Sequence, residues 1–83
     1  MNRRRLLRRL VSGSVQNVAF REMVDLVEGF GFAQVRTSGS HHIFTHPDVP
    51  TPLNLQEVRG EAKPYQIRQL LRMIERYALR LED

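Results

Sequence analysis

The sequence contains no cysteine, and lysine occurs only once, at position 63. Without thiols the chain can form neither a disulfide nor a thiolate metal site, which fits a reducing, cytoplasmic setting. It also lacks an apolar run long enough to span a bilayer, and polar residues resume directly after Leu10-Val11, so neither a membrane helix nor a signal peptide is expected. The length of 83 residues allows one domain with a small core.

Positive charge is concentrated at the start of the chain. The formal net charge of +4 comes from 13 basic and 9 acidic residues. Five arginines lie within residues 3–9, so the rest of the chain carries eight basic and nine acidic residues. An electrostatic field that attracts nucleic acid is therefore local. Since arginine binds phosphate and carboxylate equally well, RNA and an acidic protein are both candidate partners.

Residues 3–11 are predicted to form a short amphipathic helix, closed by Ser12-Gly13-Ser14. Its apolar stripe consists of Leu6, Leu7, Leu10 and Val11. The simplest interpretation is that this stripe packs on the core while the arginines stay in solvent. Phosphate binding by the arginines and contact with a membrane surface are the alternatives. We treat residues 1–17 as a basic helical extension to a domain at 18–83.

Two further helices are predicted. Residues 21–29 have apolar residues at helical spacing and end at Gly29 and Gly31. Pro64 opens the longest helix, because a proline at the first position costs no hydrogen bond. The apolar stripe of that helix is Ile67, Leu70, Leu71, Ile74 and Ala78. A separate row at i+4 spacing consists of Arg68, Arg72 and Arg76. By default this row is a solvated face; a phosphate track and a contact to an acidic partner are the alternatives.

Between these helices the sequence predicts a small antiparallel sheet. Residues 32–36 and 43–45 form a hairpin around Gly39, and residues 53–56 form a third short strand. Three prolines favour a loop over residues 46–52, and residues 59–63 are expected to form a connecting loop. The predicted fold class is α+β, with both domain helices on one face of a three-stranded sheet and the other face open.

Strand alternation separates the two adjacent histidines of the hairpin. If Phe44 points inward, His42 and His46 share its side, and His41 points outward as the exposed imidazole. His42 is then a half-buried histidine at the sheet edge and His46 a loop residue. His42 and His46 are separated by about 13 Å of strand, so no metal site is expected. An imidazole on a flat face suits a large substrate.

His41 is the candidate catalytic residue. A free imidazole titrates at about pH 6.5 and can accept a proton from a ribose 2′-hydroxyl. The turn at Gly39 and Ser40 can approach a phosphate through its backbone N–H groups. Lys63, at a helix N-terminus, and Arg36 add positive charge. These residues predict a ribonuclease without metal or other cofactor; the alternative is a non-catalytic RNA-binding or protein-interaction module.

The run Gly39-Ser40-His41-His42-Ile43-Phe44, with His46-Pro47, Leu53-Asn54-Leu55-Gln56 and the segment 63–69, resembles the HicA family of toxin ribonucleases. The resemblance extends from about Phe20 to Leu79. It implies an α-β-β-β-α fold like that of double-stranded-RNA-binding domains, metal-independent mRNA cleavage and neutralisation by a HicB antitoxin. The family's essential histidine directly follows Gly-Ser, which is His41 here. Residues 2–17 are an extra segment relative to many members.

Overall fold

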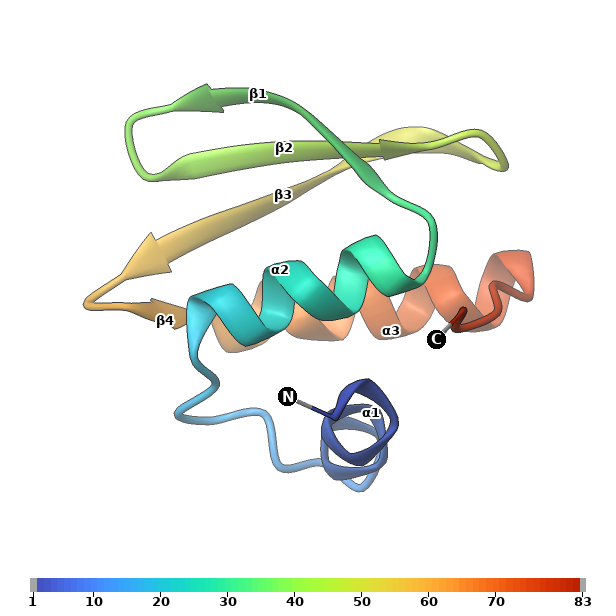
Figure 1. Cartoon of the computed structure of the whole chain (residues 1–83), viewed down its shortest axis with the longest axis horizontal. Coiled ribbons are helices and arrows are strands. Elements are labelled where there is room, and N and C mark those ends of the chain that lie inside the picture. Colours follow the sequence, from blue (N-terminus) through green and yellow to red (C-terminus); the bar gives the residue numbers. More distant parts are fainter. Residues whose placement is uncertain (1, 83) are drawn as a thin grey trace.

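The computed structural model describes residues 2–82, which form three helices and one antiparallel sheet with the strand order β1-β2-β3-β4. The elements are α1 (Arg3–Val11), α2 (Phe20–Gly29), β1 (Ala33–Ser38), β2 (His41–His46), β3 (Val49–Val58), β4 (Glu61–Ala62) and α3 (Pro64–Tyr77). Helices α2 and α3 lie on the same side of the long strands, and the opposite face is open (Figure 1). The predicted α+β class is confirmed, with β4 as a short fourth strand.

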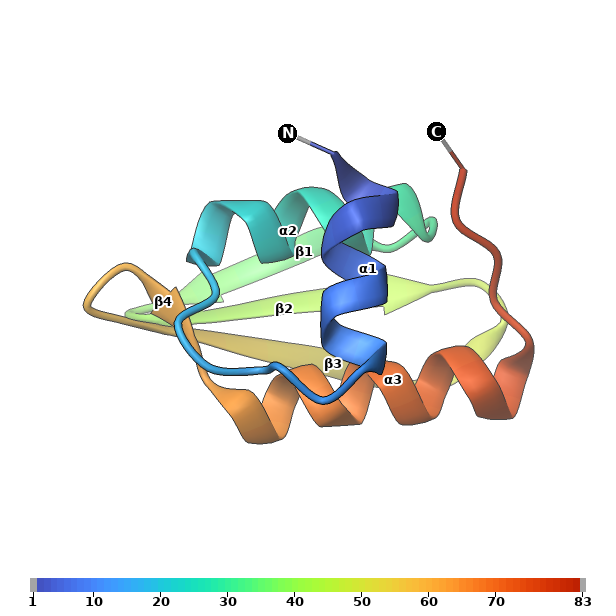
Figure 2. The same cartoon turned by 90° about the horizontal axis from the view of Figure 1, so that it is seen from below.

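The N-terminal helix α1 forms a third layer. It crosses beneath α2 and α3 on the side away from the sheet (Figure 2). Leu6 and Leu10 are buried there, and the Arg3 guanidinium forms an ion pair with Asp25 at 2.9 Å. Val11, which we expected in the apolar stripe, is 68% exposed at the last position of the helix. The leucines of α1 therefore pack on the core as predicted.

The predicted loop over residues 46–52 is wrong. Strand β2 continues to His46, which pairs with Val49, so only two residues make the turn into β3. Pro50 and Pro52 lie inside β3. Strand β4 pairs with β3 only at Glu57 and Val58, and the rest of β3 has a neighbour on one side alone. Proline is compatible with such an edge because its missing N–H can face away from the ladder.

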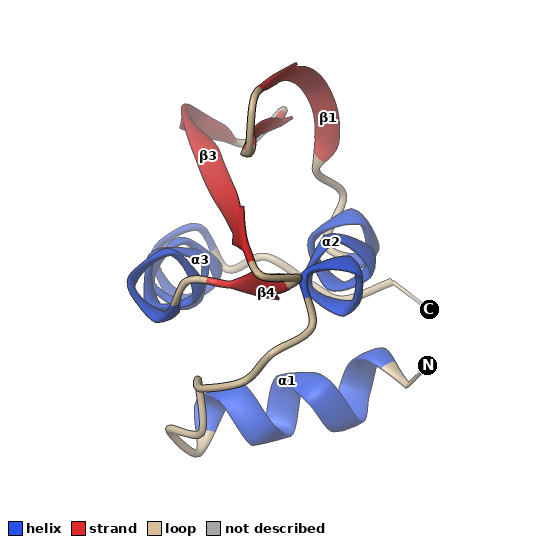
Figure 3. Cartoon of the chain, turned by 90° about the vertical axis from the view of Figure 1, so that its left-hand side faces the viewer, coloured by secondary structure: helices blue, strands red, loops and turns tan. Residues whose placement is uncertain are grey.

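The predicted connecting loop at residues 59–63 contains β4. Its Ala62 N–H donates to the Val18 carbonyl at 2.9 Å, and the Gly60 carbonyl accepts from the Phe20 N–H at 2.8 Å. Figure 3, in which α2 and α3 are seen end on, shows β4 between the two helices. This short strand therefore fixes the starts of both helices relative to the end of β3.

Helix α3 packs on β3 through Ile67 and Leu70, which are fully buried as predicted. Ala78 is wrongly placed in the predicted stripe, because it has φ 51° and terminates the helix. The chain then turns back, and the Glu82 N–H donates to the Gly29 carbonyl at 2.8 Å. No helix within residues 2–82 combines the length and apolarity needed to cross a bilayer.

Candidate active site

The turn between β1 and β2 holds the glycine and serine that precede His41. Gly39 has φ +60°, in the left-handed region that glycine adopts without strain, and no atom lies within 4 Å of where its Cβ would be. The Ser40 carbonyl accepts the Glu57 N–H at 3.0 Å. The turn is thus tied to β3 while the outer side of Gly39 is open to solvent.

His41 lies on the open face of the sheet, as strand alternation predicted, but it is half-buried rather than exposed. Its Nδ1 lies 3.1 Å from Nδ2 and 3.4 Å from Oδ1 of Asn54 on β3. Asn54 pairs with Ile43, which lies two residues after His41 and therefore on the same face of the sheet. The sequence analysis assigned no role to Asn54, since its neighbour across the ladder is known only once the register of β2 and β3 is known.

The Asn54 amide can hold the ring in either neutral tautomer. If Nδ1 carries no proton, the Nδ2–H of Asn54 donates to it; if Nδ1 is protonated, it donates to Oδ1 after the amide turns over. In the second arrangement the unprotonated nitrogen of His41 is Nε2. Within residues 2–82, the hydrogen bonds of the ring all involve Nδ1. Nε2 is therefore the atom available to a substrate.

The two candidate cations occupy different places. Arg36 is exposed on β1 and pairs with Ile43, which puts it on the open face in the strand next to His41. Lys63 directly precedes α3, and its Nζ lies 5.9 Å from the centre of the Tyr65 ring. The hairpin therefore brings Arg36 and the glycine turn to His41, whereas Lys63 lies beyond β3, at the start of α3.

A buried glutamine connects that helix to the strand opposite His41. Gln66 is 2% exposed, and its Oε1 accepts the backbone N–H of Gln56 at 2.6 Å. Gln56 is the cross-strand partner of His41. The apolar periodicity of α3 gave no sign of this polar contact, because it depends on the way α3 docks against β3.

The other two histidines face the helices. The ring of His42 lies 4.7 Å from that of Phe20, and its Nδ1 lies 3.1 Å from Nε2 of Gln34. His42 is therefore half-buried, as alternation predicted, but the predicted position at the sheet edge is wrong, because β2 is an interior strand and His42 pairs with both Thr37 and Leu55. Within residues 2–82 no three side chains of histidine, aspartate or glutamate are grouped so that they could hold a metal ion.

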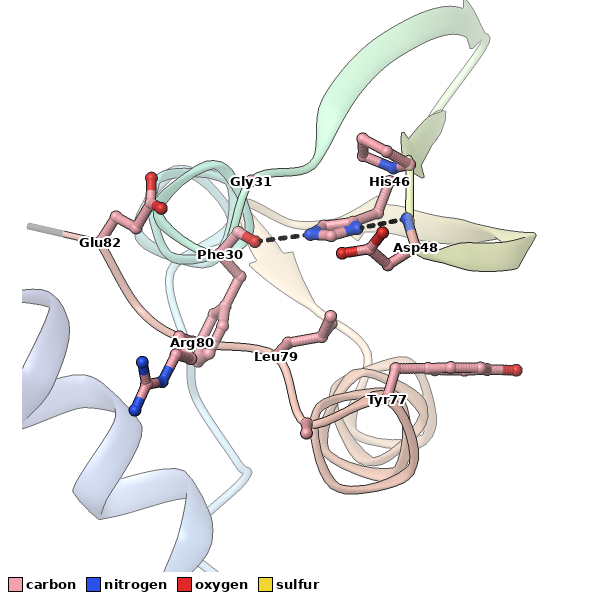
Figure 4. Close-up of a pocket in the computed structure, with 10 residues that line it drawn as sticks. Phe30, Gly31, His46, Asp48, Tyr77, Leu79, Arg80 and Glu82 are labelled. Carbon is pink, nitrogen blue, oxygen red and sulfur yellow. Dashed lines mark hydrogen bonds between the residues drawn. The ribbon is translucent and has the colours of Figure 1, made fainter.

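The prediction of His46 as a loop residue is wrong. It ends β2, where its Nε2 lies 3.0 Å from the Phe30 carbonyl and its Nδ1 accepts the Asp48 N–H at 3.0 Å (Figure 4). These contacts define one neutral tautomer, with the proton on Nε2. The ring borders a cavity of about 360 Å³ between α2 and the C-terminal segment. The two hydrogen bonds of His46 thus connect the β2–β3 turn to the end of α2.

The fold and site define a small α+β protein that presents one imidazole, beside a glycine turn, on an open sheet face. Residues 20–75 match the family described as the HicA toxin of bacterial toxin-antitoxin. Because this match covers more than half of the chain, from α2 into the last turn of α3, the protein belongs to the HicA toxin family. No curated protein and no solved structure matches it.

Proposed function

We propose that this protein is the toxin of a type II toxin-antitoxin pair, a cytoplasmic endoribonuclease that cleaves mRNA without a metal. His41 is its proton-transfer residue. The observation that carries the proposal is the position of His41 in a HicA family member: on the open sheet face, with Nδ1 held by Asn54 and Nε2 available. A flat face of this kind admits a polymer, which a closed pocket would exclude.

The reaction uses the nucleophile that RNA carries itself. With Nδ1–H donating to Asn54, the Nε2 atom of His41 accepts the proton of a ribose 2′-hydroxyl. The 2′ oxygen then bonds to the adjacent phosphorus, the bond to the 5′ oxygen breaks, and that oxygen takes up a proton. Backbone N–H groups of the turn at Gly39 and Ser40, and the Arg36 guanidinium, stabilise the negative charge on the phosphate.

Lys63 acts at a greater distance in this proposal. It stands at the N-terminus of α3, where the helix dipole also favours an anion. Its Nζ lies 5.9 Å from the centre of the exposed Tyr65 ring. We assign it to RNA binding and not to proton transfer.

The direct test is incubation of the purified protein with an end-labelled transcript in EDTA. We expect cleavage, with 2′,3′-cyclic phosphate and 5′-hydroxyl ends. Products with 5′-phosphates would instead indicate a metal-activated water as nucleophile. A mobility shift without any cleavage would assign the protein to the non-catalytic RNA-binding class.

The proposal includes a HicB-like antitoxin that neutralises the toxin by covering the open face around His41. An acidic protein encoded by the adjacent reading frame is the expected partner. Histidine acylation by diethyl pyrocarbonate, mapped by mass spectrometry, tests the masking. We expect His41 to react in the toxin alone and to be protected in the complex. Equal reactivity of His41 in both samples would contradict steric masking.

A further inference from the structure

The outer face of α3 carries a row of three exposed arginines, Arg68, Arg72 and Arg76. Their i+4 spacing places successive members about 6 Å apart along the helix axis. Like charges at this spacing destabilise a helix. Within residues 2–82 none of the three has a carboxylate within ion-pair distance, since the ion pair of the structure joins Arg3 and Asp25. The stability of the fold therefore does not explain why these three arginines are placed in one row.

A groove runs beside the row and joins it to the sheet. The groove has a volume of about 540 Å³, and Arg72 and Arg76 line it together with Pro50 and Thr51 of β3. Pro50 and Thr51 lie in the stretch of β3, between Val49 and Leu53, where its pairing with β2 shifts register and where β3 has no neighbour on its other side. The groove therefore reaches the free edge of β3, in the sheet that carries His41.

Aromatic side chains stand at both ends of the row. Tyr65 is 56% exposed at the start of α3, and the guanidinium of Arg76 lies 5.6 Å from the centre of the Tyr77 ring at its end. A cationic groove with aromatic rings is the arrangement that binds single-stranded nucleic acid through phosphate contacts and base stacking.

The exposed apolar residues favour nucleic acid over a protein partner. Protein interfaces have an apolar centre. Within residues 2–82, the large hydrophobic side chains that are exposed are Val11, Val35, Val58 and Tyr65. Of these, Tyr65 alone belongs to α3; the apolar side chains beside Arg72 and Arg76 include the half-buried Leu71 and the exposed ring of Pro50.

We propose that Arg68, Arg72 and Arg76 form a phosphate track, which holds single-stranded RNA on one side of the bond to be cleaved. The strand passes from His41 along β3, around the edge at Pro50, and onto α3. The track rests on the proposed function for its choice of RNA. Binding to it is nevertheless separable from cleavage, because the arginines lie outside the residues that transfer protons.

The test compares two triple variants with the same loss of charge. One replaces Arg68, Arg72 and Arg76 with glutamine. The matched control replaces three exposed arginines of α1 and α2 with glutamine: Arg5, Arg8 and Arg21. The probe is a fluorescent single strand of about 12 nucleotides, a length within the site sizes of single-strand-binding folds. Its 2′-O-methyl riboses have no 2′-hydroxyl to attack, and fluorescence anisotropy gives Kd across a salt series.

We expect the α3 triple to raise Kd at low salt by about tenfold or more. The slope of log affinity against log salt should fall by about 2, because each phosphate contact to a single strand contributes about 0.7. The control triple should change both quantities much less. Equal effects of the two triples, or no effect of the α3 triple, would overturn the track. The track would also be overturned if the α3 triple lost binding to polyglutamate but kept its RNA affinity. That result would assign the row to an acidic protein.

A failure of the track can be distinguished from a failure of the nuclease proposal. Cleavage of the end-labelled transcript and binding of the probe are therefore measured side by side on the unmodified protein and on the α3 triple. If binding depends on the α3 arginines but no transcript is cleaved, the track stands and the nuclease proposal fails. If transcripts are cleaved and the α3 triple binds normally, the nuclease proposal stands and the track fails.

Discussion

His41 and Asn54 face each other across β2 and β3, with Nδ1 of the imidazole 3.1 Å from the amide nitrogen and 3.4 Å from the amide oxygen of the asparagine. This contact holds the ring through Nδ1, and Nε2 has no hydrogen-bond partner within residues 2–82. It makes Asn54 a positioning residue for the proposed proton transfer. Its neighbours on the same face provide matched controls.

Asn54→Ala should lower the cleavage rate by about tenfold or more, because the ring loses the contact that orients it; general base catalysis as a whole contributes about 10² to 10⁴ fold. Asn54→Asp should restore activity, since a carboxylate also accepts from Nδ1–H. It should also move the rising limb of the pH–rate profile to higher pH, because a carboxylate favours the protonated ring. Thr45→Ala, an exposed change on the same face, is the control. Unchanged activity of Asn54→Ala would remove Asn54 from the account.

Gln66→Leu should lower the free energy of unfolding by about 1–3 kcal/mol, because the Gln56 N–H loses its buried acceptor. Urea denaturation measures the change. Gln69→Leu, one turn away at a half-buried position, is the matched control and should have a smaller effect. Equal losses in the two variants would show that the hydrogen bond to Gln56 is not what the buried glutamine contributes.

Gly31→Ala should destabilise the fold more than Gly39→Ala. Both glycines have positive φ, +98° and +60°, so each alanine is strained, by about 1 kcal/mol in the left-handed region. At Gly31 the added Cβ would also lie 3.0 Å from Nε2 of His46 and disturb its contact with the Phe30 carbonyl. At Gly39 it would meet nothing within 4 Å. Equal unfolding midpoints in urea would contradict this difference.

The ion pair between Arg3 of α1 and Asp25 of α2 should stabilise the fold only at pH values where Asp25 is ionised. Asp25 accepts hydrogen bonds from Nε and Nη2 of Arg3, at 3.1 and 2.9 Å, and these bonds lower its pKa. A lowered carboxyl pKa gives stability that is present above the unfolded pKa and lost as pH falls through the folded pKa. Both side chains are partly exposed, so the contribution is about 0.5 kcal/mol.

Urea denaturation of Asp25→Asn from neutral pH down to about pH 2.5 measures this contribution, since the range crosses the ordinary pKa of aspartate. The difference from the unmodified protein should be full near pH 7 and shrink as the carboxylate becomes protonated. Glu28→Gln, an exposed change on the same helix, is the control. A difference that is constant across the pH range would show that the ion pair is not its cause.

Local patterns in the sequence were enough to predict the three helices, the first hairpin and the faces of His41 and His42. Each of these depends on the 3.6- or 2-residue period and on turn residues close in sequence. The predicted third strand, 53–56, is shorter than β3 because Pro50 and Pro52 favour a loop before it. Whether a proline breaks a strand depends on which edge lacks a neighbour, and that is set by β4.

The features that the sequence did not reveal depend on contacts between distant segments. Strand β4 has two residues, and besides its pairing with Glu57 and Val58 its position depends on backbone hydrogen bonds with Val18 and Phe20, some forty positions earlier in the chain. The roles of Asn54 and Gln66 depend on strand register and on helix docking. The sequence wrongly predicts His46 as a loop residue, because its two hydrogen-bond partners, the Phe30 carbonyl and the Asp48 N–H, are backbone groups that the sequence pattern does not reveal.

The most direct test of the central claim is the cleavage rate of His41→Ala in EDTA, compared with that of Ser38→Ala. Ser38 is the exposed cross-strand partner of His41 in β1, so the two changes alter the same part of the hairpin. Circular dichroism and urea denaturation establish that both variants are folded. The account predicts that Ser38→Ala cleaves the transcript and His41→Ala does not. Full cleavage by a folded His41→Ala protein would contradict it.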